Sequence, residues 1–90
     1  MSYDEICHAV KRVRRKYGTL DPIKLCKAMD IVLLYQSFGK APDAIKGFFI
    51  EISRIKTITV NGDLPLVIQR IVIMHEIGHA VLHRKQGIYA

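Results

Sequence analysis

Apolar residues in the first third of the chain recur at the spacing of two helices. In the first segment they lie three or four positions apart, at Ile6, Ala9, Val10, Val13 and Tyr17. Ser2 and Glu5 form a capping-box signature at the start of this segment, and Gly18 is suited to end it. The pair Asp21-Pro22 offers a cap and a first helical proline, which predicts a short second helix through roughly Met29.

The middle of the chain contains short runs of β-branched and aromatic residues that predict strands. Ile31 to Tyr35 is the first run, and a loop containing glycine and proline follows it. Gly47 to Ile52 and Lys56 to Val60 are two further candidates, and Ser53-Arg54-Ile55 between them is a connection of hairpin length. We therefore expect three strands, the last two paired as a hairpin.

The last third of the chain is dominated by one long helical segment. Asp63 can cap a helix that begins near Leu64 or Pro65, continues through Leu82 and is ended by Gly87. The segment is apolar on most sides, which is typical of a helix buried in a core. The order of helix, helix, strands and buried helix predicts an α+β fold.

Ninety residues, half of them apolar, suit a single compact domain with one modest core. The formal charge of +6 would suit a nucleic-acid partner if the cations gathered on a binding surface. The densest basic run consists of Lys11, Arg12, Arg14, Arg15 and Lys16. We interpret this run as a solvated helix face, since no interleaved aromatic residues accompany it, and we rank DNA binding below other functions. Arg70, within the last helical segment, is expected to snorkel or to pair with an acid.

Three features lead us to expect a cytoplasmic protein. The amino terminus lacks the basic start, apolar run and small-residue cleavage site of a secretion signal. The longest apolar stretch is shorter than the roughly 20 residues of a membrane-spanning helix. Cys7 and Cys26 are far apart and lie in amphipathic segments, so we interpret them as reduced core thiols.

The last helical segment contains the pentapeptide His75-Glu76-Ile77-Gly78-His79, which matches the HExxH pattern. Helical positions four apart lie some 40° apart on one face, so both imidazoles can reach one metal ion. Glu76 lies about 100° from His75, where it can hydrogen-bond a water at the metal without being a ligand. Zinc lowers the pKa of such a water toward about 7, and Glu76 can then act as general base for attack on a peptide carbonyl.

A catalytic zinc site needs a third protein ligand, and the sequence leaves that ligand open. No Asp or Glu follows Glu76, and His83 would lie about 12 Å along the helix axis from His75, too far for one straight helix to close the site. His8 is free to approach through the fold. The alternative is that the histidines are surface or hydrogen-bonded core residues and the pentapeptide is accidental. Gly78 weighs against this alternative, because glycine inside a helix costs about 1 kcal/mol unless a backbone or substrate passes close by.

Three segments resemble the ImmA/IrrE family of metallopeptidases: Ile58-Thr-Val-Asn61, Arg70-Ile-Val-Ile-Met74 and His75-Glu-Ile-Gly-His-Ala-Val-Leu-His83. The resemblance implies a zincin-like fold, in which amino-terminal helices pack on a small three-stranded sheet beside a long buried active-site helix. It implies that His75 and His79 bind zinc and that Glu76 is the catalytic residue. It also implies a bacterial or phage setting, where such proteins cleave or inactivate a repressor of the helix-turn-helix type.

The chain departs from the family in one respect, because family members take their third ligand from an acidic residue on a helix well downstream. We therefore expect residues 1–90 to form a single metallopeptidase-like domain that lacks its carboxy-terminal portion. We expect this chain to bind zinc weakly or not at all, and to hydrolyse substrates poorly. Apolar surface left uncovered would favour a homodimer. The leading alternative function is a non-catalytic interaction module of the same fold that acts as an anti-repressor by binding alone.

Overall fold

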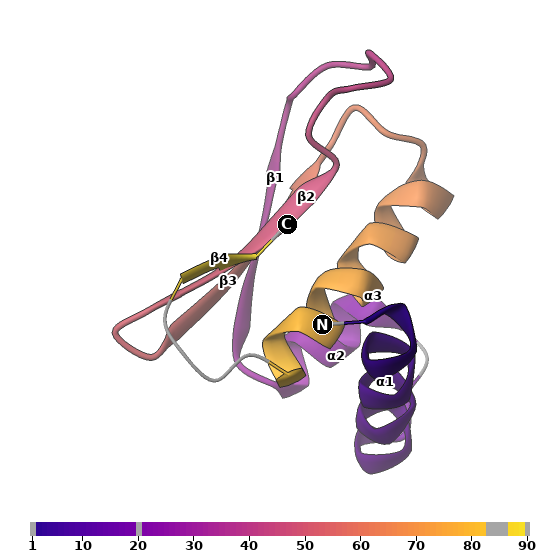
Figure 1. The fold of residues 1–90 in the computed structure, drawn as a ribbon, viewed down its shortest axis with the longest axis vertical. Coiled ribbons are helices and arrows are strands. Elements are labelled where there is room, and N and C mark those ends of the chain that lie inside the picture. Colours follow the sequence, from indigo (N-terminus) through magenta and orange to yellow (C-terminus); the bar gives the residue numbers. More distant parts are fainter. Residues whose placement is uncertain (1, 20, 83–86, 90) are drawn as a thin grey trace.

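The computed structural model describes residues 2–19, 21–82 and 87–89, and it has the α+β fold expected from the sequence (Figure 1). Among these residues the elements follow in the order α1 (Tyr3–Tyr17), α2 (Pro22–Ala28), β1 (Ile31–Gln36), β2 (Gly47–Ile52), β3 (Ile55–Asn61), α3 (Leu66–Leu82) and β4 (Gly87–Tyr89). No helix in this described part of the chain is long and apolar enough to cross a membrane.

Local sequence signals set the ends of the two amino-terminal helices. At the start of α1, the Glu5 backbone N–H donates to Ser2 Oγ over 3.1 Å, and the Ser2 N–H donates to Glu5 Oε1 over 3.3 Å. Gly18 ends the helix with a φ of 68°, a left-handed conformation that glycine adopts without steric cost. Asp21 caps α2 by accepting a hydrogen bond from the Ile23 N–H over 2.9 Å. These observations confirm the predicted capping box, glycine cap and second helix.

The sheet has the strand order β1-β3-β2-β4. β1 lies parallel to β3, and β2 pairs antiparallel with β3 across a tight turn. Ser53 and Arg54 in that turn have φ values of 52° and 69°, the left-handed backbone that matches the twist of hairpin strands. The three predicted strands are confirmed, and β4 adds a short antiparallel strand beside β2. Gly87 begins β4, so it does not end the last helix as predicted.

Helix α3 lies between the sheet and α1, and only part of it is buried (Figure 1). The core combines residues of α1, α2, α3 and the sheet: Val13, Leu25, Cys26, Ile31, Phe49, Ile58, Val60, Val72, Ile73, Ile77 and Ala80. The expected burial therefore holds for the carboxy-terminal half of α3. It does not hold for the first turns of the helix, where Leu66 and Val67 are 75% and 68% exposed. The physical reason is that this end of the helix projects beyond α1 and α2.

Asp63 has a different role from the predicted helix cap. Helix α3 begins at Leu66, three residues after Asp63. The Asp63 carboxylate instead accepts hydrogen bonds from Ser37 Oγ and, over 2.8 Å, from the Gly39 N–H. These two bonds lower the pKa of the carboxyl group, because they favour its charged form. Asp63 thus fastens the loop after β1 to the turn that precedes α3.

Both cysteines are free thiols, as the sequence predicts. Cys26 belongs to the core, where burial raises the pKa of its thiol to about 11. Cys7 is half-buried on α1 and lines a cavity between α1 and α3. Neither residue therefore forms part of a disulfide framework in this fold.

Candidate metal centre on helix α3

His75 and His79 lie one turn apart on α3, and their imidazole rings converge. Their Nε2 atoms are 3.1 Å apart, and the ring planes meet at 85° with centroids separated by 4.7 Å. Two nitrogen ligands of a tetrahedral zinc ion, each bonded at about 2.0–2.1 Å, lie roughly 3.3 Å from each other. The pair therefore fits as two ligands of one such ion. When both rings are neutral, one can donate a hydrogen bond to the other.

Glu76 follows His75 on the buried side of the helix. Its side chain is 2% exposed, and its Oε1 atom is buried without a hydrogen-bond partner. Burial raises the pKa of this carboxyl group to about 8, because the charged form has lost its solvation. A carboxyl group with this pKa can take up and release a proton near neutral pH, as a general base or acid must.

A cleft of about 460 Å³ opens beside these residues, between α3 and the segment that leads into β2. It is lined by Ala44, Ile45, Lys46, Gly47, Ile71, Val72, His75 and Glu76. Gly47 permits the close approach at its edge, since a Cβ atom there would lie 2.6 Å from Val72 Cγ1 and 2.9 Å from the Thr59 carbonyl oxygen. The cleft is large enough to hold a side chain or a short chain segment, and His75 and Glu76 of α3 line it.

Asn61, at the end of β3, fixes the wall of the cleft opposite α3. Its buried Nδ2 group donates to the carbonyl oxygens of Gly39 and Ile45 over 2.8 and 3.0 Å. Its Oδ1 atom accepts from the N–H groups of Phe38 and Asp63 over 3.3 and 2.9 Å. Sequence reasoning missed this role, because an Asn-Gly pair is also an ordinary turn signal. The sequence does contain a signal for this role, since the side-chain amide of a residue that ends a buried strand must find hydrogen-bond partners.

Gly78 lies where α3 meets α1. A Cβ atom at this position would come within 2.3 Å of Ile6 Cγ2 and 3.4 Å of the Ile6 backbone oxygen. Glycine therefore allows the two helices to pack closely. The sequence predicts that a backbone or a substrate passes close to this glycine, and in the structure the neighbour is the first helix.

The described residues contain no group of three histidine, cysteine or carboxylate side chains that could hold a metal ion. His8 is exposed on α1 and does not join the pair. His83, the other candidate for a third ligand, lies outside the described residues. The described part of the site thus consists of two convergent imidazoles and one neighbouring carboxyl group.

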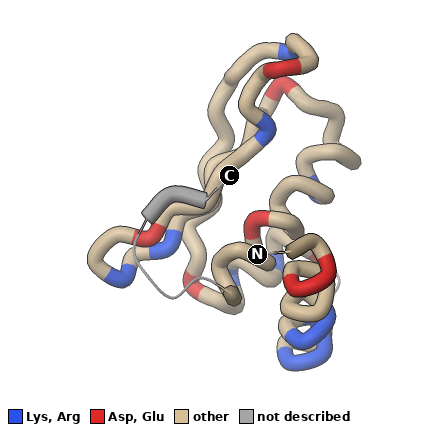
Figure 2. The backbone as a smooth tube through the Cα atoms, viewed as in Figure 1, with Lys and Arg blue, Asp and Glu red and all other residues tan. Residues whose placement is uncertain are grey.

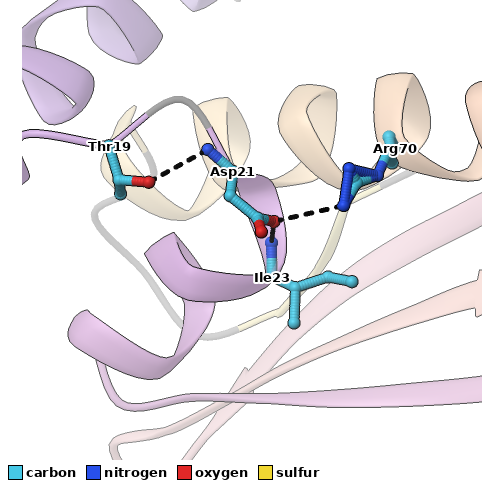
Figure 3. Close-up of polar contacts among 4 residues, drawn as sticks. All are labelled: Thr19, Asp21, Ile23 and Arg70. Atoms are coloured by element: carbon cyan, nitrogen blue, oxygen red, sulfur yellow. Dashed lines mark hydrogen bonds and ion pairs between the residues drawn. The ribbon is translucent and has the colours of Figure 1, made fainter.

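Most basic residues of α1 and α3 have the surroundings expected from the sequence. Arg70 on α3 reaches the residue that caps α2, with Nη2 3.6 Å from Asp21 Oδ1, so its predicted pairing with an acid is confirmed (Figure 3). Lys and Arg gather along the carboxy-terminal half of α1 (Figure 2). Most of them are exposed, as a solvated face requires, but Arg14 is half-buried.

The chain is similar to known proteins over most of its length. The profile of peptidase family M78, described as the IrrE N-terminal-like domain, matches residues 26–89. A protein of Bacillus phage phi105 named uncharacterized immunity region protein 2 is 33% identical over 81 residues, which cover 90% of this chain and 49% of that protein. The chain therefore spans about half the length of this curated relative. No solved structure matches it.

Proposed function

Since the chain belongs to the peptidase M78 family of IrrE N-terminal-like domains, we propose that it is a zinc-dependent peptidase of the ImmA/IrrE type. In this proposal His75 and His79 bind the metal, Glu76 is the general base, and the substrate is a bacterial or phage repressor of the helix-turn-helix type. The name of the phage relative, an immunity region protein, is compatible with a substrate that controls a mobile element.

The proposal is carried by one observation, the convergence of two imidazoles beside a buried carboxyl group, where His75 and Glu76 line a cleft. The two Nε2 atoms are 3.1 Å apart, and Glu76 Oε1 has no hydrogen-bond partner. A buried carboxyl group without a partner destabilises a fold, and such groups concentrate at functional sites. Helical spacing alone would bring the two histidines together in an accidental pentapeptide, but it would not explain the buried Glu76 Oε1 without a partner beside them.

Each residue has a defined task in the proposed reaction. His75 and His79 would hold zinc through Nε2, and the ion would supply a Lewis acid that polarises a peptide carbonyl and acidifies the attacking water. Glu76 would accept the proton at Oε1 and return it to the leaving amine. Glu76 must be ionised for this task, and a neighbouring cation favours the carboxylate, which opposes the effect of burial on its pKa. Ile45 and Ile71 would give the cleft apolar contacts for a bound chain segment.

A second function is favoured by a different observation. Among the described residues two side chains, His75 and His79, are candidates for metal ligands, where a catalytic zinc site uses three. A chain of this fold that bound a repressor without cleaving it would act as an anti-repressor and would not need Glu76 as a base. A substitution that removes only the base therefore separates the two functions.

The test is cleavage of a purified helix-turn-helix repressor encoded beside this gene, followed by mass spectrometry over long incubations with zinc or with a chelator. We expect Glu76→Gln to retain zinc and to lose cleavage, because an amide cannot accept the proton. Arg12→Gln changes an exposed side chain and is expected to cleave like the unsubstituted chain.

Two outcomes would count against the peptidase proposal. Cleavage that persists in Glu76→Gln would contradict the role of this residue as base. Equal binding of the repressor by both chains, with cleavage by neither, would support the anti-repressor function instead.

A further inference from the structure

A second cavity, of about 320 Å³, lies between α1 and α3. Its lining is mostly apolar and consists of Tyr3, Ile6, Cys7, Val10, Lys11, Arg14, Ile71, Met74 and His75. Ile71 and His75 line this cavity and also the cleft described above. The two residues are four positions apart on one helix face, so they form a ridge with one cavity toward β2 and the other toward α1.

Lys11 and Arg14 give this second cavity a positive end. They are three positions apart on α1 and share a face of the helix, and no carboxylate is among the described residues that line the cavity. Arg14 is half-buried, and its Nε atom is buried without a hydrogen-bond partner. An N–H group in this state has lost water without gaining an acceptor, and an incoming carboxylate would supply a charge-assisted hydrogen bond.

We propose that the cavity between α1 and α3 is a subsite for an acidic side chain of the polypeptide bound in the cleft. This inference rests on the proposed function, because it takes the cleft to be the place where a polypeptide binds. The apolar walls suit the methylene groups of a Glu side chain, and Lys11 and Arg14 suit its carboxylate. Two members of the basic run on α1 then serve recognition, while the rest of the run remains a solvated face.

The two cavities are close enough for one short peptide to occupy both. An α-helix with its side chains is about 10 Å across, and an extended chain advances roughly 3.3 Å per residue. In a bound peptide, an acidic residue about three positions from the peptide residue that lies beside Glu76 would therefore reach Lys11 and Arg14. The subsite selects substrates by the position of an acidic residue relative to the peptide bond at Glu76.

The test uses the whole chain, kept free of metal by a chelator, and four peptides. Acetyl-Leu-Ala-Ala-Glu-amide and acetyl-Glu-Ala-Ala-Leu-amide cover both directions of a bound chain, and their Gln counterparts remove only the charge. Binding is followed through the NMR signals of the methyl groups of Ile6, Ile71 and Met74, with Ile52 as a reference outside both cavities. We expect at least one Glu peptide to bind about fivefold more tightly than its Gln counterpart, with a smaller difference at high salt.

A matched pair of double variants supplies the control. Lys11→Gln with Arg14→Gln is expected to remove the preference for Glu. Arg12→Gln with Arg15→Gln is expected to retain it, because these exposed residues of the same helix lie outside the cavity. Both variants lose two charges and keep good helix formers.

Three results would overturn the subsite: equal binding of Glu and Gln peptides, no shift of the Met74 signal with any peptide, or the same loss of preference in both double variants. None of these readings requires hydrolysis. A failure of the proposed peptidase activity would therefore be distinguished from a failure of the subsite.

Discussion

Both halves of α3 are rich in apolar residues, but their surroundings differ. In the first half Leu66, Val67 and Ile71 are 60 to 75% exposed, whereas in the second half Ile77 and Ala80 are at most 4% exposed. The first half projects past α1 and α2, and the second is enclosed between α1 and the sheet (Figure 1). An apolar run therefore does not decide burial by itself, because burial depends on which elements pack against it.

The candidate metal site lies just past the point where one half gives way to the other. His75 and His79 are half-buried, and Glu76 is buried. The enclosed half provides a rigid anchor for these side chains, and the open half leaves the cleft accessible. The exposed apolar residues of the first half are also where we propose that a homodimer forms.

The same substitution made in each half gives the largest expected contrast. Ile77→Ala is expected to lower the free energy of unfolding by about 4 kcal/mol, because it leaves a void in a close-packed core. Ile71→Ala is expected to lower it by about 0.5 kcal/mol or less, because the side chain is mostly exposed. Chemical denaturation of both variants measures the contrast. A loss above about 2 kcal/mol for Ile71→Ala would mean that the first half is covered in solution.

Glu76→Gln tests the electrostatics of the enclosed half in the metal-free chain. The pKa of Glu76 is about 8 in the folded chain against an ordinary 4.5, so the folded state binds the proton more tightly. This contribution to stability is complete below pH 4.5 and is lost as the pH rises toward 8. A shift of this size corresponds to about 5 kcal/mol at pH 9, and an amide buried without partners costs up to about 3 kcal/mol. Glu76→Gln should therefore be more stable by about 2 kcal/mol at pH 9, with a flatter pH profile between those limits. Denaturation of both chains across this pH range measures the difference in the free energy of unfolding. Parallel dependences of that free energy on pH would contradict the raised pKa of Glu76.

Gly78→Ala tests how closely the enclosed half meets α1. The added methyl group would overlap Ile6 Cγ2, and the gain in helix propensity would offset part of that strain. We expect a net loss of about 1 kcal/mol in the free energy of unfolding. Adding Ile6→Ala removes the overlapping methyl group, so the double variant should show a favourable coupling in a mutant cycle. Strictly additive effects would mean that the helices do not touch at this point.

Arg70→Ala has the smallest expected effect. The Arg70 side chain is 50% exposed, and its ion pair with Asp21 has a distance of 3.6 Å. An exposed pair of this kind contributes about 0.5 kcal/mol or less, and high salt should remove the difference. Thermal unfolding of both chains at low and high salt measures this loss of stability. A loss above about 1 kcal/mol would show that α2 depends on this residue for its attachment to α3.

Much of the fold could be predicted from the sequence, because local signals fix most of its elements. Each of the capping residues Ser2, Gly18 and Asp21 bonds to a residue only a few positions away in the chain, and each has the predicted capping role. The hairpin of β2 and β3 likewise depends on a short connection. Asp63 could not be assigned in this way, because its partners lie in a loop more than twenty residues earlier in the chain.

The candidate site could be predicted only as far as one helix turn determines it. The spacing of His75 and His79 predicts that their imidazoles converge, and they do. The four side-chain hydrogen bonds of Asn61 and the approach of Gly47 to Val72 depend on packing between distant segments, which helical periodicity cannot reveal. The half-buried position of Arg14 could not be predicted for the same reason, since a helical-wheel projection of α1 does not show where α3 packs against it.

A zinc titration of the metal-free chain by calorimetry, beside His75→Gln and His79→Gln, tests whether these two imidazoles bind the metal. The two described nitrogen ligands are expected to bind one zinc ion per chain more weakly than about micromolar, and either substitution should abolish that binding. One-to-one binding of unchanged strength in either variant would contradict the assignment of the metal to this pair.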